Sequence, residues 1–405
     1  MKQRKKDGKI STLYKKYQNN RDVISFFSGA MGLDIGLSKA GLHVVIGQDF
    51  EPACVETMKA NGHKVLGGDI RNIEPETMLQ LSGLHKGEPF LICGGPPCQP
   101  FSTAGKRLGI NDPRGSLFMD YIRMIDYIRP RFFIMENVKG IMSAPLKHVP
   151  AAEYDKNDPK QKLGTVLDVI LAEFDKLGYK TVYGILDAVN YGVPQFRERF
   201  VLIGSRDNED IFLPFPTHFQ MHQNPEYRWK TVGEAIKDLE ENPGEYSKLS
   251  GDRKKYIHLV PEGGNWRDLP AELIPLAMGG AYESGGGKVG FYRRLSYSQP
   301  APTVTTAPAQ KATMLCHPNQ DRPLSVKEYA RIQQFPDDWI FTGTVAAKYK
   351  QIGNAVPVGL AKAIGQAIIA TADKTSTIQT KRFRGTSVHN KIKNAMELGG
   401  SDGTN

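Results

Sequence analysis

The sequence predicts an α/β protein in which buried parallel strands alternate with helices, followed by a smaller, loop-rich domain. Short apolar runs recur in the first half of the chain and end in glycine or polar residues, as buried strands do. Segments with helical spacing lie between these runs and stop at glycine or proline. Over residues 207–290 the composition changes to aromatic and basic residues interleaved with glycine, and the only confident helix in this interval is Val232–Leu239. With 405 residues, 40% of them hydrophobic, the chain is long enough for two domains.

The first expected strand covers residues 22–28, and a glycine-rich turn over residues 29–36 leads into a helix. Glycines let the backbone approach a ligand, and a helix N-terminus offers free N–H groups. A second strand, residues 44–49, ends in Asp49 at roughly the 20-residue spacing at which a carboxylate binds ribose hydroxyls. Phe50 follows and is well placed to lie on an adenine face. This pattern favours an adenosine-bearing cofactor, which is either NAD or S-adenosylmethionine.

Residues 90–93 form a further apolar run, and two glycines and two prolines separate it from Cys98. Cys98 is therefore expected just beyond the carboxyl end of a strand, where open α/β sheets bind their ligands. A polar loop over residues 102–115 follows. Its basic residues, Lys106, Arg107 and Arg114, would favour the thiolate form of Cys98. The alternative interpretation of Cys98 is a buried thiol at a tight turn.

A helix is expected from Leu117 to Ile128, and the next buried strand, residues 132–135, leads to Glu136. Glu136 should lie on the same rim of the sheet as Cys98, where burial raises the pKa of a carboxyl group. Its alternative is a helix cap or a surface carboxylate. Arg197 and Arg199 belong to an Arg-Glu-Arg run that, taken alone, is typical of a solvated surface.

The remaining elements complete the domain prediction. A helix is expected over residues 166–177, with strands over residues 179–186 and 199–203. A last apolar helix should open at residues 351–357, run to about Ala370 and pack back against the first domain. The sequence predicts a catalytic and cofactor-binding domain over residues 21–206 and a small domain over residues 207–344. A helix over residues 345–373 should return to the first domain. Basic tails cover residues 1–20 and 374–405.

Charge and cysteine content narrow the class of protein. The net charge of +10 comes entirely from the two ends of the chain. Residues 1–19 contain seven basic residues and one acidic residue, and residues 374–405 contain six basic and two acidic residues. These tails either hold nucleic-acid phosphates or serve as disordered, solubilising ends. No apolar run approaches a membrane span in this reading, and no signal peptide is expected. The cysteines show neither disulfide nor metal spacing, which predicts a reducing compartment and no metal: Cys54, Cys93, Cys98 and Cys316.

Several motifs together resemble the DNA cytosine-5 methyltransferase family. Gly-Gly-Pro-Pro-Cys-Gln-Pro-Phe-Ser, residues 94–102, resembles the family's nucleophile motif, and Glu-Asn-Val, residues 136–138, its second catalytic signature. Residues 195–199 resemble its Gln-x-Arg-x-Arg motif. Residues 27–32 resemble its Phe-x-Gly-x-Gly-Gly cofactor turn, with Met31 in place of the middle glycine. Six such motifs occur in the family's order between Phe26 and Pro357.

The resemblance implies a doubly wound, Rossmann-like S-adenosylmethionine-dependent domain and a target-recognition domain, with DNA between them. Cys98 would add to C6 of a flipped cytosine, after which C5 takes the methyl group. Glu136 would stabilise the ring at N3, and Arg199, with Arg197 nearby, would hold O2.

The resemblance also implies the binding residues. Cofactor contacts are expected at Phe27, Gly29, Ala30, Gly32, Asp49, Phe50, Asp69, Ile70, Gly95, Pro97, Leu117 and Asn354. DNA contacts are expected at Gln99, Ser102, Lys106, Arg107, Arg228, Lys230, Trp266, Arg267, Lys288, Arg293 and Arg294. The implied setting is a monomer in a bacterial cytoplasm, associated with the nucleoid, without membrane or metal, and functionally paired with a restriction endonuclease.

Three other readings stay open. A tRNA cytosine-5 methyltransferase would share the chemical motifs, but its usual Cys-Phe-Thr signature is not found in the chain. A catalytically silent DNA-binding relative is disfavoured by the presence of Cys98, Glu136 and both arginines. An NAD-linked oxidoreductase would explain Asp49 and the glycine turn, but it leaves Gly-Pro-Pro-Cys unexplained.

Overall fold

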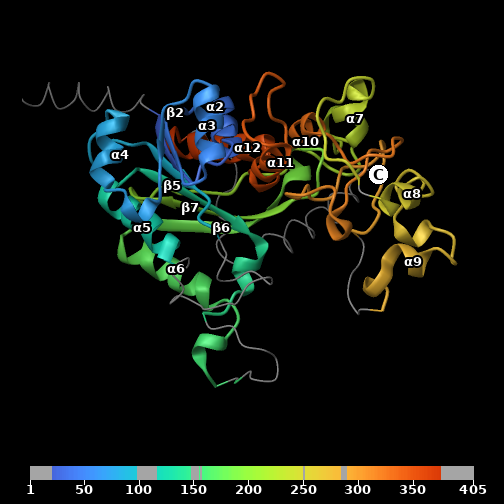
Figure 1. Ribbon diagram of the computed structural model, residues 1–405. Coiled ribbons are helices and arrows are strands. Elements are labelled where there is room, and N and C mark those ends of the chain that lie inside the picture. The colour runs from blue at the N-terminus through green and yellow to red at the C-terminus, as the bar shows by residue number, and fades with distance from the viewer. Residues whose placement is uncertain are drawn as a thin grey trace, which may run out of the picture.

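The computed structural model describes residues 21–97, 116–146, 155, 157–249, 251–283 and 290–374. This part of the chain contains a seven-stranded sheet in the order β3-β2-β1-β4-β5-β7-β6 (Figure 1). The strands are β1 (Asp22–Phe26), β2 (His43–Asp49), β3 (Val65–Gly67), β4 (Leu91–Gly94), β5 (Phe132–Val138), β6 (Lys180–Asp187) and β7 (Glu198–Ser205). The strands expected from the sequence are all present, with ends that differ by a few residues.

Strand direction decides which residues meet at the edge of the sheet. From β3 to β5 all neighbouring strands are parallel, whereas β7 is antiparallel to both β5 and β6. The first residues of β7 therefore lie beside the last residues of β5, and Arg199 is the register partner of Val138. This reversal brings a motif that follows Glu136 by some sixty positions in the chain to the same rim of the sheet.

Helices cover both faces of the sheet. Up to residue 206 they are α2 (Gly32–Lys39), α3 (Pro52–Ala60), α4 (Pro75–Ser82), α5 (Ser116–Ile128) and α6 (Thr165–Lys176). Along β5, Phe133 and Met135 face a core made with α4, α5 and α6, while Phe132 and Ile134 face a core made with α2 and α12. This alternation is the period of two that a strand buried on both faces requires. The sheet is therefore doubly wound.

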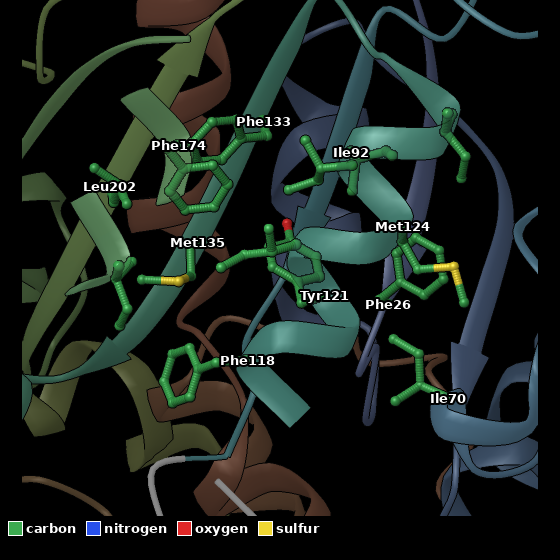
Figure 2. Packing of buried hydrophobic residues seen from close by; sticks show 14 of the residues in the cluster. Phe26, Ile70, Ile92, Phe118, Tyr121, Met124, Phe133, Met135, Phe174 and Leu202 are labelled. Carbon is green, nitrogen blue, oxygen red and sulfur yellow. The ribbon is translucent and has the colours of Figure 1, made fainter. Parts of the chain in front are cut away.

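Figure 2 shows the core under α5, where Tyr121 and Phe133 lie among side chains from four strands. The Tyr121 hydroxyl donates a hydrogen bond to the Ile134 carbonyl at 2.6 Å, which satisfies a buried polar group. The ring of Phe133 stacks on Phe174 of α6, with ring centroids 4.0 Å apart. It also covers Gly204 so closely that a Cβ atom there would lie 1.9 Å from the Phe133 ring.

The remaining helices are α7 (Val232–Ile236), α8 (Asp252–Ile257), α9 (Ile274–Met278), α10 (Val326–Ile332), α11 (Val345–Asn354) and α12 (Val358–Ala372). α12 returns from the far end of the described chain to pack against α2. A Cβ atom on Gly36 would lie 2.3 Å from the Ala361 side chain, so this glycine permits the close approach of α12. Gly36, which was not among the predicted cofactor contacts, thus has a packing role.

Two expectations about helices also need correction. Residues 351–354 end α11 and do not open the last helix, because Pro357 lacks the N–H group that a continuous helix would need. Within residues 207–290, α8 and α9 form where no helix was expected. Each spans fewer than two helical turns, which is too short to show a helical period in the sequence.

One apolar cluster joins the two parts of the molecule. Met31 of the first turn and Met58 of α3 pack with Val304, Leu324 and Tyr329 of the second part. Among the described residues, one stretch (Val345–Ala372) has the length and composition of a membrane span, which the sequence analysis did not anticipate. It consists of α11 and α12, and 67% of its most apolar window is buried, as in a core helix.

Candidate active site

Glu136 and Arg199 form a buried ion pair at the carboxyl edge of the sheet. Glu136 lies in β5 and is 9% exposed. Arg199 reaches it from β7, with Nε 2.9 Å from the Glu136 Oε1 atom. Glu136 thus falls two residues before the end of its strand, because the pairing with β7 continues to Val138. Its alternatives, a helix cap or a surface carboxylate, do not describe this position.

The surroundings of Glu136 have opposing effects on its protonation. Burial raises the pKa of the carboxyl group, while the charges of Arg199 and Arg197 and the hydrogen bond from Arg199 lower it. Burial is the largest of these effects, so the pKa of Glu136 lies above its ordinary value. Such a carboxyl group holds a proton more readily than one in water and can share it with a ligand.

The segment before Cys98 is fixed against the same pair. Asn137 Nδ2 donates a hydrogen bond to the Pro96 carbonyl at 2.8 Å. A Cβ atom at Gly95 would lie 2.9 Å from Glu136 Oε2, so a side chain there would displace the carboxyl group. Pro97 is the last described residue of the segment, and the predicted nucleophile Cys98 lies outside the described residues.

Arg197 is 1% exposed and sits behind the ion pair. Its guanidinium donates hydrogen bonds to the carbonyls of Val304, Gly353 and Ala355 at 2.6–3.1 Å. These carbonyls belong to the second part of the chain and to both sides of Asn354. Arg197 therefore joins β7 to these segments and adds positive charge near Glu136.

One cavity of about 670 Å³ contains the ion pair and most of the predicted cofactor residues. Glu136 and Arg199 line it. The predicted cofactor residues in its wall are Phe27, Gly29, Gly32, Asp49, Phe50, Asp69, Ile70, Gly95, Pro97, Leu117 and Asn354. Ala30 is not among the lining residues and packs into the apolar cluster between the two parts of the chain. The volume is in the range of small-molecule sites.

The wall on the β2 side combines a half-buried carboxylate with an exposed ring. Asp49 Oδ2 accepts a hydrogen bond from the Gly29 N–H at 2.8 Å, and Oδ1 accepts one from the Glu51 N–H at 2.8 Å. Burial raises the pKa of Asp49. Its remaining lone pairs can accept further hydrogen bonds from a ligand. Phe50 is 69% exposed, which leaves its ring free to stack.

Asp69 is already engaged within the protein. Its side chain caps the short helix Ile70–Asn72 and pairs with Arg71, which lowers its pKa. Arg71 lines the same cavity. A ligand at Asp69 would therefore meet a carboxylate whose charge is partly satisfied by Arg71.

The predicted DNA contacts fare differently from one another. Gln99, Ser102, Lys106, Arg107 and Lys288 lie outside the described residues. Arg294 is 4% exposed, and its guanidinium donates to four backbone carbonyls and to Asp321. The prediction that Arg294 contacts DNA is therefore wrong, because its buried guanidinium is fully engaged in joining the segments 257–260 and 317–321.

The other described basic candidates lie at or near the surface. Arg228 is exposed and donates to the His222 carbonyl at 2.7 Å. Arg267 is exposed and lies over the Trp266 ring at 4.6 Å, and Arg293 is half-buried. Lys230 pairs with Glu234 and lines a different cavity from the one that holds Glu136. Their contact with DNA stays a prediction.

Several residues that line the cavity with Glu136 were not predicted from the sequence: Ser25, Asp34, Gln48, Arg71 and Lys350. Gln48 Nε2 donates to the Gly68 carbonyl at 2.6 Å, and Lys350 Nζ lies 2.5 Å from Glu51 Oε2. Asp34 carried a visible signal, since it stands between Leu33 and Ile35 on a helix with an otherwise apolar first turn. The others become apparent only when the strand ends are brought together.

Comparison with known proteins identifies the family. Residues 21–370 match the C-5 cytosine-specific DNA methylase family. The chain is 41% identical over 358 residues to the type II methyltransferase M.PspPI of Psychrobacter sp. (strain TA137), which covers 86% of this chain and 78% of the relative. It is 39% identical over 356 residues to M.Sau96I of Staphylococcus aureus, covering 87% of this chain and 77% of that one.

A solved structure supports the fold. A mutant of DNMT2 from Spodoptera frugiperda superposes with a TM-score of 0.56 at 18% identity, covering 86% of this chain and 99% of its own. The doubly wound sheet, the ion pair at its edge and these relatives agree. The chain belongs to the C-5 cytosine-specific DNA methylase family and is a DNA (cytosine-5-)-methyltransferase with the α/β fold of S-adenosylmethionine-dependent enzymes.

Proposed function

We infer that the protein methylates C5 of one cytosine in a specific duplex DNA sequence, through a flipped base and a covalent bond between Cys98 and C6. The observation that carries this proposal is the buried Glu136–Arg199 pair, which shares a cavity with Pro97, the residue before Cys98. A stacked base cannot reach a pair buried at the edge of the sheet, so the target cytosine has to leave the duplex.

The reaction begins at the pyrimidine ring. The Cys98 thiolate adds to C6, and electron density moves toward N3 and O2 and makes C5 nucleophilic. C5 then takes the methyl group, the C5 proton is lost to a base, and the Cys98–C6 bond breaks to return the thiolate. Bound S-adenosylmethionine supplies the methyl group on a positively charged sulfur.

Glu136 would hold the ring through N3. Because burial raises its pKa, the carboxyl group can carry a proton to N3 as the ring becomes electron-rich. Glu136→Gln removes this exchangeable proton and keeps the side-chain size. The Arg199 guanidinium orients the carboxyl group through Oε1 at 2.9 Å.

Arg199 would hold O2 at the same time. Its Nε atom contacts Glu136, and Nη1 donates to the Glu198 carbonyl at 2.8 Å. No described residue accepts a hydrogen bond from Nη2, so that amino group can donate to cytosine O2. Arg197 would keep Arg199 in place through its bonds to the second part of the chain.

The cavity suits S-adenosylmethionine both by its size and by the polar and aromatic groups that line it. Asp49 offers acceptors to the ribose, Phe50 an exposed face to adenine, and Asn354 an exposed polar side chain at the rim. The remaining predicted contacts would hold the cofactor by their backbone or by packing. The proposal includes no metal.

The second part of the chain would read the DNA sequence. Its exposed basic residues at Arg228 and Arg267 can reach phosphates or guanine edges. The relatives named above are type II methyltransferases, which supports a role as the modification enzyme of a restriction-modification system. We further propose a cytoplasmic, nucleoid-associated monomer that pairs functionally with an endonuclease without forming a stable complex.

Bisulfite sequencing of DNA from cells that express the chain tests the proposal. The expected result is 5-methylcytosine at one position of one short sequence, absent from cells that express Glu136→Gln. Unmodified DNA together with methylated tRNA would contradict the DNA assignment, and random methylation would contradict the sequence-specific one.

A further inference from the structure

Asp34 is a buried carboxyl group that forms no ion pair and no hydrogen bond of ordinary geometry with the described residues. It is the third residue of α2 and 1% exposed, and neither of its oxygens has a hydrogen-bond partner of ordinary geometry. It is also one of the residues that line the cavity of about 670 Å³. A carboxyl group that is removed from water without hydrogen bonds or an opposite charge is costly, so its presence calls for a partner that binds there.

The neighbours of Asp34 supply little relief. The Ser25 hydroxyl on β1 accepts a hydrogen bond from Ser28 Oγ at 2.8 Å. This hydroxyl and the backbone N–H of Asp34 itself lower the pKa of Asp34, but by less than burial raises it. The charge of Asp49 acts in the opposite direction. In the part of the chain that the structure describes, no lysine or arginine forms an ion pair with Asp34.

Burial is the dominant influence and raises the pKa of Asp34 to about 6. The carboxyl group is therefore ionised at neutral pH in a site that disfavours its charge. A positively charged group that enters the cavity would relieve this cost, whereas an anion would increase it.

The position of Asp34 narrows the identity of that cation. In the proposed function, Asp49 and Phe50 mark the adenosine end of the cofactor, and Glu136 marks the end at which the methyl group is transferred. Asp34 belongs to neither end, because it lies on the first turn of α2 beside β1. What remains of the cofactor is the methionine tail, which carries an ammonium group and a carboxylate. The free N–H groups at the start of α2 suit the carboxylate, which leaves the ammonium group for Asp34.

We propose that the Asp34 carboxylate is the counter-ion of the α-ammonium group of S-adenosylmethionine. This inference rests on the proposed function, since it names a contact within the proposed cofactor site. It assigns to Asp34 a binding role that depends on one functional group of the ligand, and a purely structural role for Asp34 would show no such dependence.

Calorimetric titration of the purified full-length chain tests the assignment with two probes, S-adenosylhomocysteine and its analogue without the α-amino group. The wild-type chain should bind S-adenosylhomocysteine at least tenfold more tightly than the analogue. Asp34→Asn should weaken S-adenosylhomocysteine at least tenfold and change the affinity for the analogue less than twofold. Asp22→Asn provides a matched control, because Asp22 is a buried acid at the opposite end of β1 that pairs with His43. It should leave both affinities unchanged.

Several results would overturn the inference. Equal affinities of the wild-type chain for the two probes would do so without any variant. So would an Asp34→Asn chain that binds S-adenosylhomocysteine as the wild type does, or that loses affinity for both probes equally. A larger effect on S-adenosylmethionine than on S-adenosylhomocysteine would move the contact to the sulfonium. A wild-type chain that binds neither cofactor form would refute the proposed function, and the inference with it.

Discussion

Replacement of Asp34 by asparagine should change how the stability of the ligand-free protein depends on pH. The folded state raises the pKa of this carboxyl group from 3.8 to about 6, chiefly through burial. Well below pH 3.8 the group is protonated in the folded and unfolded states alike, and it does not affect stability. As the pH rises toward 6, the unfolded chain loses this proton first, so the folded state binds more protons and becomes less stable. The penalty is complete above about pH 7 and amounts to about 3 kcal/mol, since one pKa unit corresponds to about 1.4 kcal/mol.

The measurement is urea unfolding of the wild-type and Asp34→Asn chains at several pH values without cofactor. About half of the penalty, some 1.4 kcal/mol, develops between pH 5 and pH 8. Over this range the free energy of unfolding of the wild type should fall by that amount relative to the variant. The buried amide of the variant has a cost of its own, but that cost does not vary with pH. Parallel curves for the two chains would show that Asp34 is not destabilised by its site.

Three further predictions concern the reaction, the packing of the core and the segment that recognises the DNA sequence. Glu136→Gln should slow methyl transfer about 100-fold or more in a single-turnover assay, because a proton-handling group is lost; a loss below tenfold would contradict its role. Gly204→Ala should lower the free energy of unfolding by about 1–3 kcal/mol, because the new methyl group would overlap the Phe133 ring. Gly140→Ala, with open space around it, should cost less than about 0.5 kcal/mol, and equal losses would refute the steric argument. Exchange of residues 207–290 with those of a relative should move the methylated sequence, as bisulfite sequencing would report; an unchanged target would exclude this interval as the reader.

Much of the sheet could be predicted because its strands are buried on both faces. Phe132 to Met135 read as a continuous apolar run, and such a run between helical segments is typical of a parallel strand. The antiparallel direction of β7 could not be predicted from the sequence, because the pattern of apolar residues in a strand does not indicate its direction in the sheet. Yet that reversal is what places Arg199 against Glu136.

The site was predicted mainly from motifs, and the limits of that approach show in single residues. Asp49 and Phe50 could be placed from their distance to the glycine turn, since one βα unit sets that geometry. Arg294 was wrongly predicted to contact DNA because the residue type does not show whether an arginine is buried or exposed. Its five acceptors come from segments that only the fold brings together. A ligand-binding role for Asp34 was not predicted, because it depends on the lack of hydrogen-bond partners of ordinary geometry around the buried carboxyl group, which only the fold reveals.

The domain boundaries stay predictions, and the packing explains why they are hard to draw. Met31 stands where the family usually has glycine and adopts a left-handed backbone with φ of 66°. Its side chain is fully buried against residues of the second part of the chain, including Val304 and Tyr329. A substitution that looks like a local defect in a cofactor turn thus contributes to the apolar contact between the two parts.

The most direct test of the central claim is the capture of the bond between Cys98 and C6 of the target base. A duplex with 5-fluorocytosine at the methylated position carries no C5 proton to lose, so the adduct should persist after methyl transfer. With S-adenosylmethionine present, the wild-type chain should form a denaturant-resistant complex with this duplex, and peptide mapping should locate the link at Cys98. Cys98→Ser should form none. A wild-type chain that methylates ordinary duplex DNA but never yields the complex, or yields it through another residue, would contradict the account.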